Sequence, residues 1–383
     1  MRLKSITYSQ FEGRPNEWDL EEFSLGNINL LVGKNATGKS RTLNIIRGLG
    51  NLVSGDVKLQ YLSGNYKAMF DKDGKQISYS LKYENNKVIE EKMIVGSEVK
   101  LDRGLHGIGK IWSDEVNKLM NFQAPETELA CVNRRDSVQH PFFEDLYQWG
   151  RRLRYYYFGD RMGKDYLAQL KEESEESKLN LKDSNLVVTI FSKGERKYVK
   201  EFKESIICDM GKLGYEIDDI TIGTPMGLIF SGPTLYTQPQ GFILQESDLP
   251  GLTDQNDMSQ GMFRAFSLII QLNYSQLASI PSCILIDDIG EGLDYDRSTA
   301  LIKLIIEKAN KSSIHLIMST NDRFVMNNVP LEYWAVMQRV SNKTKIYNYE
   351  NAKKKFEDFK FTGMNNFDFF MSDFISEGLP EDE

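Results

Sequence analysis

Apolar runs separated by polar turns divide the 383-residue chain into predicted strands and helices. Apolar and polar positions alternate through residues 1–32 and end in a continuous apolar run at 28–32, so we expect two or three strands there. Apolar residues then recur at helical spacing over 43–49. We expect that helix to end near Gly48–Gly50, because glycines favour helix ends. A strand and a helix are therefore predicted on the two sides of residues 33–40.

The sequence changes character after residue 54. Short apolar runs alternate with polar turns there, which predicts a small antiparallel meander. Its predicted strands are 58–62, 77–81 and 92–95, separated by turns at 71–74 and 85–87.

The middle of the chain is less regular. Residues 111–175 look mixed or helical, and the acidic run 171–178, which lacks apolar residues, predicts an exposed helix end or loop. Further along we expect strands at 186–190, 228–230 and 242–244, and a helix at 198–212. No heptad repeat persists over several turns, which excludes a long coiled coil.

The last third has the clearest pattern. It predicts a helix at 263–272, a strand at 283–286, a helix at 298–309 and a strand at 314–318. Strands that alternate with helices indicate a parallel sheet covered on both faces. The stretch from Lys353 onward is rich in phenylalanine, and we expect it to dock on its own core or on a partner.

Composition narrows the class of protein. The length allows two or three domains or one domain with a large insertion, and 40% hydrophobic and 27% charged residues are ordinary for a soluble protein. A net charge of −8 argues against a surface built as a whole to hold nucleic acid, but leaves a local basic groove open. The basic and aromatic segment 141–154 fits a solvated helix face with core aromatics better than a nucleic-acid contact.

No secretory signal follows Met1 and no run of 18 apolar residues exists, so we expect a cytoplasmic protein without a membrane span. The cysteines and histidines are few and scattered, which offers neither a disulfide framework nor a metal site with recognised spacing. They are Cys131, Cys208 and Cys283, and His106, His140 and His315. We therefore expect the histidines to be structural.

The segment between the first strand and helix carries the clearest chemistry. Gly33-Lys34-Asn35-Ala36-Thr37-Gly38-Lys39-Ser40 matches the phosphate-binding pattern G-x-x-x-x-G-K-[S/T] in full. A strand, a glycine turn and a helix present backbone N–H groups and a positive helix end to an anion. Lys39 would reach the outer phosphates of a nucleotide and Ser40 would hold Mg²⁺. We also expect Arg41, the next residue, to contact the nucleotide.

A P-loop needs carboxylates as its second half. Mg²⁺ requires a hard oxygen ligand, and the attacking water requires a base. Asp287 and Asp288 follow the predicted strand 283–286. We expect Asp287 to orient the Mg²⁺ shell and Asp288 to polarise the water.

Further motifs resemble those of ABC-type ATPases. Asp257–Arg264 resembles the signature loop, Asp287–Asp294 the Walker B and D-loop block, and Met318–Asp322 lies where the family has its switch histidine. Gln123, within Asn121–Pro125, resembles the Q-loop glutamine that joins the metal site to the insert. The resemblance implies that Gln123, Ser259, Gln260 and Gly261 contact nucleotide, the last three across a subunit interface. It also implies that Gln123 lies at the metal with Ser40 and Asp287.

The spacing between the phosphate-binding loop and the signature-like segment indicates which branch of the ABC-type ATPases the chain resembles. Ser259 follows Ser40 by 219 positions, and the form Ser-Gln-Gly-Met-x-Arg is similar to the SMC, RecF and OLD-like branch rather than to transporter subunits. The whole looks more closely like the stand-alone AbiEii-type and AAA15-type ATPases of bacterial defence and toxin systems. The resemblance covers residues 1–50 and 250–340 well and the insert only in outline.

Two departures from the family pattern predict slow hydrolysis. The catalytic glutamate is replaced by Asp288, which is one methylene shorter, and the switch histidine by Asn321, which does not titrate. Glu291 is a second candidate base, with a structural or cross-dimer role equally open.

The resemblance implies an α/β fold: an ABC-ATPase head with a mainly parallel P-loop core sheet, an N-terminal antiparallel sheet and an inserted β-plus-helical subdomain. The expected division is 1–53 for the N-terminal lobe with the P-loop, 54–245 for the inserted lobe, 246–350 for the C-terminal lobe and 351–383 for a Phe-rich acidic tail.

The function that follows is an ATPase that uses ATP and Mg²⁺ and closes head to tail as a homodimer. Its nucleotide state would control a separate effector protein or the engagement of nucleic acid, in bacterial anti-phage defence. Two alternatives stay open at this point: a RecF- or SMC-like ATPase of DNA repair or maintenance, and a nucleotide-dependent scaffold with little turnover.

Overall fold

The computed structural model describes residues 1–59, 61–169, 181–227, 238–280, 283–312, 314–372 and 374–377. The chain forms two compact units. The first unit comprises residues 1–153, 315–319 and 330–383, and the second unit comprises 154–314 and 320–329. The predicted inserted lobe 54–245 coincides with neither unit, because its first half extends the sheet of the first unit while its second half belongs to the second.

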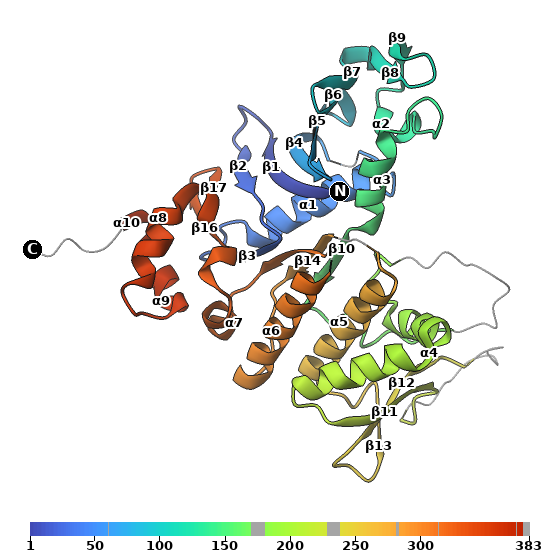
Figure 1. Cartoon of the computed structure of the whole chain (residues 1–383), viewed down its shortest axis with the longest axis vertical. Coiled ribbons are helices and arrows are strands. Elements are labelled where there is room, and N and C mark those ends of the chain that lie inside the picture. Colours follow the sequence, from blue (N-terminus) through green and yellow to red (C-terminus); the bar gives the residue numbers. More distant parts are fainter. Residues whose placement is uncertain are drawn as a thin grey trace, which may run out of the picture. The chain divides into compact units, whose positions relative to one another are not determined.

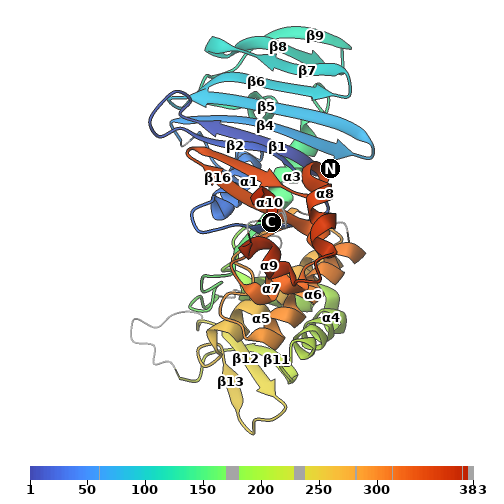
Figure 2. The ribbon, with the colours of Figure 1, turned by 90° about the vertical axis from the view of Figure 1, so that its left-hand side faces the viewer.

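A large mixed sheet forms the body of the first unit (Figure 2). Its strands are β1 (Arg2–Gln10), β2 (Trp18–Ser24), β3 (Ile28–Val32), β4 (Ser63–Lys72), β5 (Lys75–Glu84), β6 (Lys87–Val95), β7 (Glu98–Arg103), β8 (Ile108–Ser113), β9 (Lys118–Gln123), β15 (His315–Ser319), β16 (Trp334–Val340) and β17 (Lys343–Tyr347). They lie in the order β15-β3-β16-β17-β2-β1-β4-β5-β6-β7-β8-β9. β15, β3 and β16 run parallel, whereas β1 and β4 to β9 form an antiparallel meander.

The meander agrees with its sequence pattern except at its start. Its first strand begins at Ser63, and the described residues of 58–62 form no strand, which corrects that prediction. The turns lie where polar residues predict them. Asp73 and Asn85 adopt φ of 53° and 48°, a left-handed conformation that Asn and Asp tolerate better than most residues.

The helix α1 (Lys39–Val53) continues past the glycines that were expected to end it. Gly50 instead marks a close helix contact with α3 (Phe143–Arg152). A Cβ on Gly150 would lie 2.4 Å from the carbonyl oxygen of Gly50, and one on Gly50 would lie 3.0 Å from Leu153. The glycines therefore allow two helices to approach, and they do not stop one.

Helix α3 carries the basic and aromatic segment, and the structure places its aromatics in the core. Phe143 and Trp149 are buried, and the Trp149 ring lies 4.9 Å from that of Phe70. Arg151 forms an ion pair with Asp56 at 2.9 Å. These contacts agree with the interpretation of a solvated helix face over core aromatics.

The Phe-rich segment docks on its own unit. It forms α8 (Tyr349–Lys360), α9 (Asn366–Met371) and α10 (Phe374–Glu377), which follow the short helix η2 (Leu331–Tyr333) and the last hairpin. Phe359 and Phe374 are buried together with Phe369, whose ring lies 6.1 Å from that of Trp334. The phenylalanines thus cover the β16 side of the sheet.

The second unit contains the helices labelled α4 to α7 in Figure 1. Its elements are β10 (Arg154–Tyr157), α4 (Val187–Lys212), β11 (Ile217–Gly223), β12 (Gly241–Glu246), β13 (Leu252–Asp254), α5 (Gln260–Leu277), β14 (Cys283–Asp287), α6 (Tyr295–Lys311) and α7 (Arg323–Asn328). β10 and β14 pair in parallel, and β11, β12 and β13 form a small antiparallel sheet.

One predicted strand of this unit is wrong. Residues 186–190 begin the helix α4, because a short continuous apolar run fits a buried helix as well as a strand. Phe191 and Phe202 on α4 pack against each other with ring centroids 5.7 Å apart, and Phe191 contacts Phe242 of β12. The predicted strand 228–230 and the acidic run 171–178 lie outside the described residues. Within the described chain, no helix is long and apolar enough to span a bilayer.

Candidate functional site

The glycine loop of the first unit surrounds the buried ammonium group of Lys39. Lys39 is 7% exposed, and its Nζ donates to the carbonyl oxygen of Gly33 at 2.7 Å and to that of Lys34 at 3.4 Å. Ala36 and Gly38 turn the chain with φ of 64° and 107°. The loop thus places a positive charge at the N-terminal end of α1, where backbone N–H groups and the helix dipole favour an anion.

Neighbouring strands fix the shape of this loop. A Cβ on Gly33 would lie 2.6 Å from Oγ1 of Thr37 and 3.0 Å from the carbonyl oxygen of Met337, so glycine is required there. The Thr344 hydroxyl donates to the carbonyl oxygen of Thr37 at 3.2 Å. Lys34, Asn35, Ala36 and Ser40 are exposed, which leaves the turn open to a ligand.

Arg41 lies on the flank of the loop. Its guanidinium carbon is 4.1 Å from the centre of the Trp18 ring, and partial burial lowers the pKa of Arg41 below its ordinary value. Trp18 is 2% exposed, so the arginine covers the ring.

The two predicted carboxylates end the buried strand β14 of the second unit. Asp287 is 2% exposed, and its Oδ2 accepts a hydrogen bond from the Tyr155 hydroxyl at 3.2 Å. Asp288 leaves the strand with φ of 55°, a conformation that Asp adopts more readily than most residues. The Asn321 amide lies 3.4 Å from Oδ1 of Asp288. The structure therefore brings together Asp288 and Asn321, which are far apart in sequence.

The predicted signature loop begins helix α5. Ser259 is the N-cap, and its Oγ accepts from the backbone N–H of Met262 at 3.2 Å. Ser259 is exposed and Gln260 is half-buried, with its amide 3.4 Å from the carbonyl oxygen of Asp160. A Cβ on Gly261 would lie 2.7 Å from the carbonyl oxygen of Gly292, so this glycine lets α5 approach the loop after β14.

The loop after β14 leads into α6 and is fixed by side-chain caps. Asp294 caps α6 by accepting from the backbone N–H of Arg297 at 3.0 Å, which lowers the pKa of Asp294. Asp322 caps α7 and accepts from Ser298 at 3.3 Å. Glu291 is exposed. Its carbonyl oxygen accepts a hydrogen bond from Nη1 of Arg264 at 2.8 Å.

Gln123 does not lie at the glycine loop, which corrects the Q-loop prediction. It ends β9, ten places from β3 in the strand order, and neighbouring strands lie about 4.8 Å apart. Figures 1 and 2 both draw β9 at the far end of the meander from β3. The Gln123 amide donates to the carbonyl oxygen of His106 at 3.2 Å. A hairpin strand, and not a loop beside the site, carries this glutamine.

Sequence reasoning missed the residue that does lie beside Asp287. Tyr157 is opposite Asp287 in the parallel pair β10–β14, and the carboxyl ends of adjacent parallel strands form a common edge. Burial and then the nearby Asp288 and Asp287 carboxylates raise the pKa of Tyr157. The aromatic run Arg154–Tyr157, followed by Gly159, is a strand signal that could have found it.

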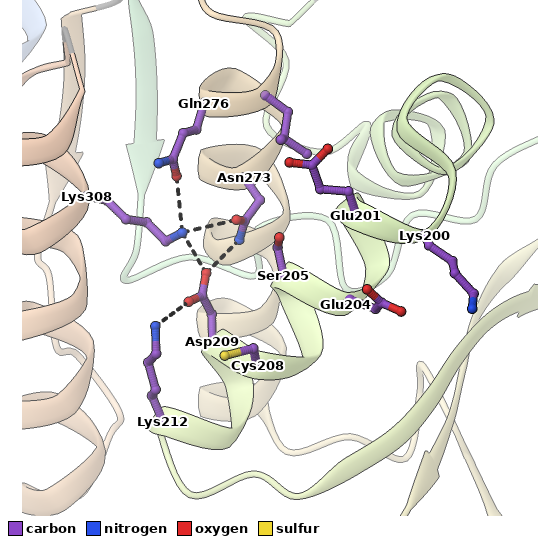
Figure 3. A pocket seen from close by; sticks show the side chains of 11 residues that line it. Lys200, Glu201, Glu204, Ser205, Cys208, Asp209, Lys212, Asn273, Gln276 and Lys308 are labelled. Atoms are coloured by element: carbon purple, nitrogen blue, oxygen red, sulfur yellow. Dashed lines mark hydrogen bonds and ion pairs between the residues drawn. The ribbon is translucent and has the colours of Figure 1, made fainter.

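A cavity of about 680 Å³ in the second unit is lined in part by a cluster of hydrogen-bonded polar side chains (Figure 3). Asp209 of α4 pairs with Lys308 of α6 at 2.7 Å and with Lys212 at 3.1 Å, and it accepts from Asn273 of α5 at 2.8 Å. Lys308 also donates to Asn273 and to Gln276. Because these groups satisfy one another, the cluster joins three helices.

Among the described residues, no three His, Cys, Asp or Glu side chains converge in a way that could hold a metal ion. Cys131, Cys208 and Cys283 are free thiols.

The fold is similar to that of solved SMC heads. An SMC head solved in complex with the C-winged helix domain of ScpA is 12% identical, with a TM-score of 0.51 over 91% of this chain and 97% of that one. The SMC head domain from Thermotoga maritima is 14% identical, with a TM-score of 0.46 over 91% of this chain and 99% of that one. No curated protein matches the sequence.

A family model described as "AAA domain, putative AbiEii toxin, Type IV TA system" matches residues 28–327. That match covers the glycine loop, the predicted signature, the carboxylates and Asn321. It agrees with the fold, a P-loop head of the SMC type with a mainly parallel core and an antiparallel meander. The chain therefore belongs to this AbiEii-type AAA family.

Proposed function

We propose that this protein binds and hydrolyses ATP with Mg²⁺ and acts as a switch. ATP would close two copies head to tail, and the closed dimer would control a separate effector protein or the engagement of nucleic acid. The family description supports a role in bacterial defence, which we propose to be anti-phage defence. The observation that carries the proposal is the Lys39 ammonium held inside the glycine loop by the carbonyl oxygen of Gly33.

Different residues of the loop would contact different parts of the bound Mg²⁺ and ATP. The backbone of Gly33–Ser40 would surround the phosphates, Lys39 would neutralise the outer ones, and Ser40 would ligate Mg²⁺. The motif order along the chain assigns Asp287 to the Mg²⁺ shell. Mg²⁺ would supply charge neutralisation on the phosphate oxygens.

Hydrolysis needs a base for the attacking water. We assign this role to Asp288, whose carboxylate is oriented by the Asn321 amide at 3.4 Å. The water oxygen attacks the γ-phosphorus, its proton passes to Asp288, and ADP leaves with the bridging oxygen. Asn321 cannot relay that proton, so the structure supports slow turnover. The exposed Glu291 stays the alternative base.

The predicted cross-subunit contact has a chemical basis in Ser259. Its oxygen already accepts from the Met262 N–H, and a hydroxyl that accepts one hydrogen bond keeps its own proton to donate. Ser259 is exposed at the first turn of an 18-residue helix, whose dipole favours an anion. We therefore propose that Ser259, Gln260 and Gly261 of one copy contact the nucleotide bound by its partner.

Binding at the loop is tested by a pair of lysine variants. Lys39→Ala should weaken ATP binding at least about 30-fold in calorimetry, because hydrogen bonds from a charged group contribute roughly 2 kcal/mol or more. The control is Lys118→Ala, which removes an exposed lysine of β9, ten places from β3 in the strand order. If both variants bind ATP as the wild type does, the loop is not the nucleotide site.

The scaffold alternative is favoured by one observation, the replacement of glutamate and histidine by Asp288 and Asn321. Asp288→Asn separates the two functions. A switch driven by hydrolysis predicts that this variant holds ATP, stays dimeric and captures the effector more strongly in a pull-down from the native organism. Unchanged phosphate release and unchanged activity in cells would favour the scaffold. ATP-strengthened and salt-sensitive binding of duplex DNA would favour the DNA-repair alternative.

A further inference from the structure

A cavity of about 530 Å³ adjoins the outer side of the glycine loop, within the first unit. Its walls come from three places: the loop itself, the carboxyl end of β16 with the turn that follows, and the C-terminal helices. The lining residues are Lys34–Thr37, Val336–Ser341, Phe369, Phe370 and Ile375. Small-molecule pockets measure about 300–1,000 Å³ and combine apolar walls with a few polar groups, as this one does.

Two backbone carbonyl groups hold the Arg339 side chain at this cavity. Its Nε donates to the carbonyl oxygen of Ser341 at 2.8 Å, and its Nη1 donates to that of Ala36 at 3.3 Å. Both bonds use the edge of the guanidinium, which is exposed. A planar guanidinium bound by its edge keeps its faces for stacking on an aromatic ring. The bond to Ala36 also joins this platform directly to the loop.

The same cavity exposes apolar surface. Val340 is 76% exposed, among the most exposed large apolar side chains described, and Phe370 lines the same cavity. Ligands of parallel sheets bind outside the carboxyl ends of the strands, and β16 ends here next to β3. In a ligand that carries phosphates on a flat ring, the ring would fit the cavity while the phosphates bind at the loop.

The other flank of the loop is already filled. Trp18 lies 3.2 Å from the position of a Cβ on Gly38, but it is 2% exposed and covered by Arg41. A ring cannot stack on it without displacing that arginine.

We propose that the cavity beside β16 receives the base and ribose of the nucleotide whose phosphates bind at Gly33–Ser40, with the purine between Arg339 and the apolar pair Val340 and Phe370. This inference rests on the proposed function, because it requires that the loop bind a nucleoside triphosphate. It assigns base recognition to the last hairpin and the Phe-rich helices.

The test compares ATP with inorganic tripolyphosphate, which carries phosphates without a base. Val340→Glu and Phe370→Ala should each weaken ATP binding about tenfold, since stacking of one base contributes roughly 1–3 kcal/mol. Neither should change the affinity for tripolyphosphate by more than about twofold. Lys39→Ala should weaken both ligands. Val138→Glu, at a valine that is 63% exposed elsewhere in the first unit, is the matched control.

A second measurement locates the base directly. Photolysis of 8-azido-ATP on the wild-type protein should label residues 336–341 or 369–375. Labelling confined to residues 8–20 or to Arg41 would overturn the inference, and so would pocket variants that bind ATP normally. If the wild type binds neither ATP nor tripolyphosphate, the proposed function itself fails, and base recognition fails with it.

Discussion

Arg264 donates from Nη1 to the carbonyl oxygen of Glu291 at 2.8 Å. The same guanidinium donates from Nη2 to the carbonyl oxygen of Gly159 at 2.6 Å and from Nε to that of Asp160 at 2.8 Å. One side chain of α5 therefore ties the predicted signature helix to the loop after β14 and to the loop after β10. A shift at the carboxylate edge would be transmitted to Ser259 through this arginine.

Replacing Arg264 should separate nucleotide binding from its consequences. In Arg264→Gln we expect ATP affinity within about twofold of wild type, but ATP-dependent dimerisation and turnover lowered about tenfold or more, because three charge-assisted hydrogen bonds are lost. Arg264→Lys should recover only part of the dimerisation and turnover, since an ammonium cannot reproduce the planar set of N–H donors of a guanidinium. Arg196→Gln, at an exposed arginine of α4, is the control. Wild-type dimerisation in Arg264→Gln would show that the hydrogen bonds of Arg264 do not couple the carboxylate edge to Ser259.

The contact between α1 and α3 predicts a stability effect. Gly150→Ala would place a methyl group 2.4 Å from the carbonyl oxygen of Gly50 and 2.9 Å from Val53. We expect a loss of about 1–3 kcal/mol in the free energy of unfolding, measured with urea. Gly211→Ala in α4 meets no atom within 4 Å and should instead be neutral or stabilise by up to about 1 kcal/mol. Equal effects of the two substitutions would contradict the packing argument.

His315 should make the folded protein sensitive to acid. Burial lowers its pKa to about 3, below its ordinary value near 6.5, so the folded state holds it neutral while the unfolded state binds a proton. Above about pH 6.5 the imidazole is neutral in both states and does not change the free energy of unfolding with pH. Below that, the free energy of unfolding falls by roughly 1.4 kcal/mol per pH unit as the pH drops toward 3. In unfolding measurements from pH 7 to pH 4, His315→Leu should lose less stability than the wild type.

The matched control for that prediction is His106→Leu, because the His106 side chain is 79% exposed. Its pH profile should follow the wild type. A parallel profile for His315→Leu would mean that the buried imidazole does not titrate in this window.

The polar cluster of Figure 3 predicts a cost for breaking one ion pair. Asp209→Ala leaves the nearly buried Lys308 without its carboxylate, and loss of one partner of a buried pair costs about 3–5 kcal/mol. The double variant Asp209→Leu with Lys308→Met should recover much of that loss. Glu204→Ala, on the rim of the same cavity, should change the free energy of unfolding by less than about 0.5 kcal/mol. A single variant as stable as the wild type would contradict the assignment of the pair as buried.

Local patterns predicted those parts of the site that depend on a few adjacent residues. The loop at Gly33–Ser40, the strand before Asp287 and the helix start at Ser259 each combine a short motif with its flanking apolar run, and all three lie in the expected elements. The Phe-rich segment was likewise expected to dock, although the sequence left open whether on its own core or on a partner.

Long-range pairing decided what the sequence could not. Gln123 has a plausible local context, but only the strand order shows that β9 lies far along the meander from β3. Tyr157 reaches Asp287 only through the parallel pairing of β10 with β14, between residues 130 positions apart. Gly50 looked like a helix stop because its true neighbour, Gly150, is distant in sequence. In each case the missing information was which segment lies alongside.

The most direct test of the account is complementation between two inactive variants. Lys39→Ala lacks the phosphate contact and Ser259→Arg lacks the cross-subunit contact, so each alone should show no Mg²⁺- and ATP-dependent dimerisation by sedimentation and no phosphate release. A mixed dimer has one intact site, formed by the loop of one copy and the helix start of the other. We expect an equimolar mixture to recover up to about half of wild-type turnover, since only mixed dimers form and each has one working site out of two. No recovery from two folded variants, or full ATP-dependent dimerisation of Ser259→Arg alone, would contradict the shared site.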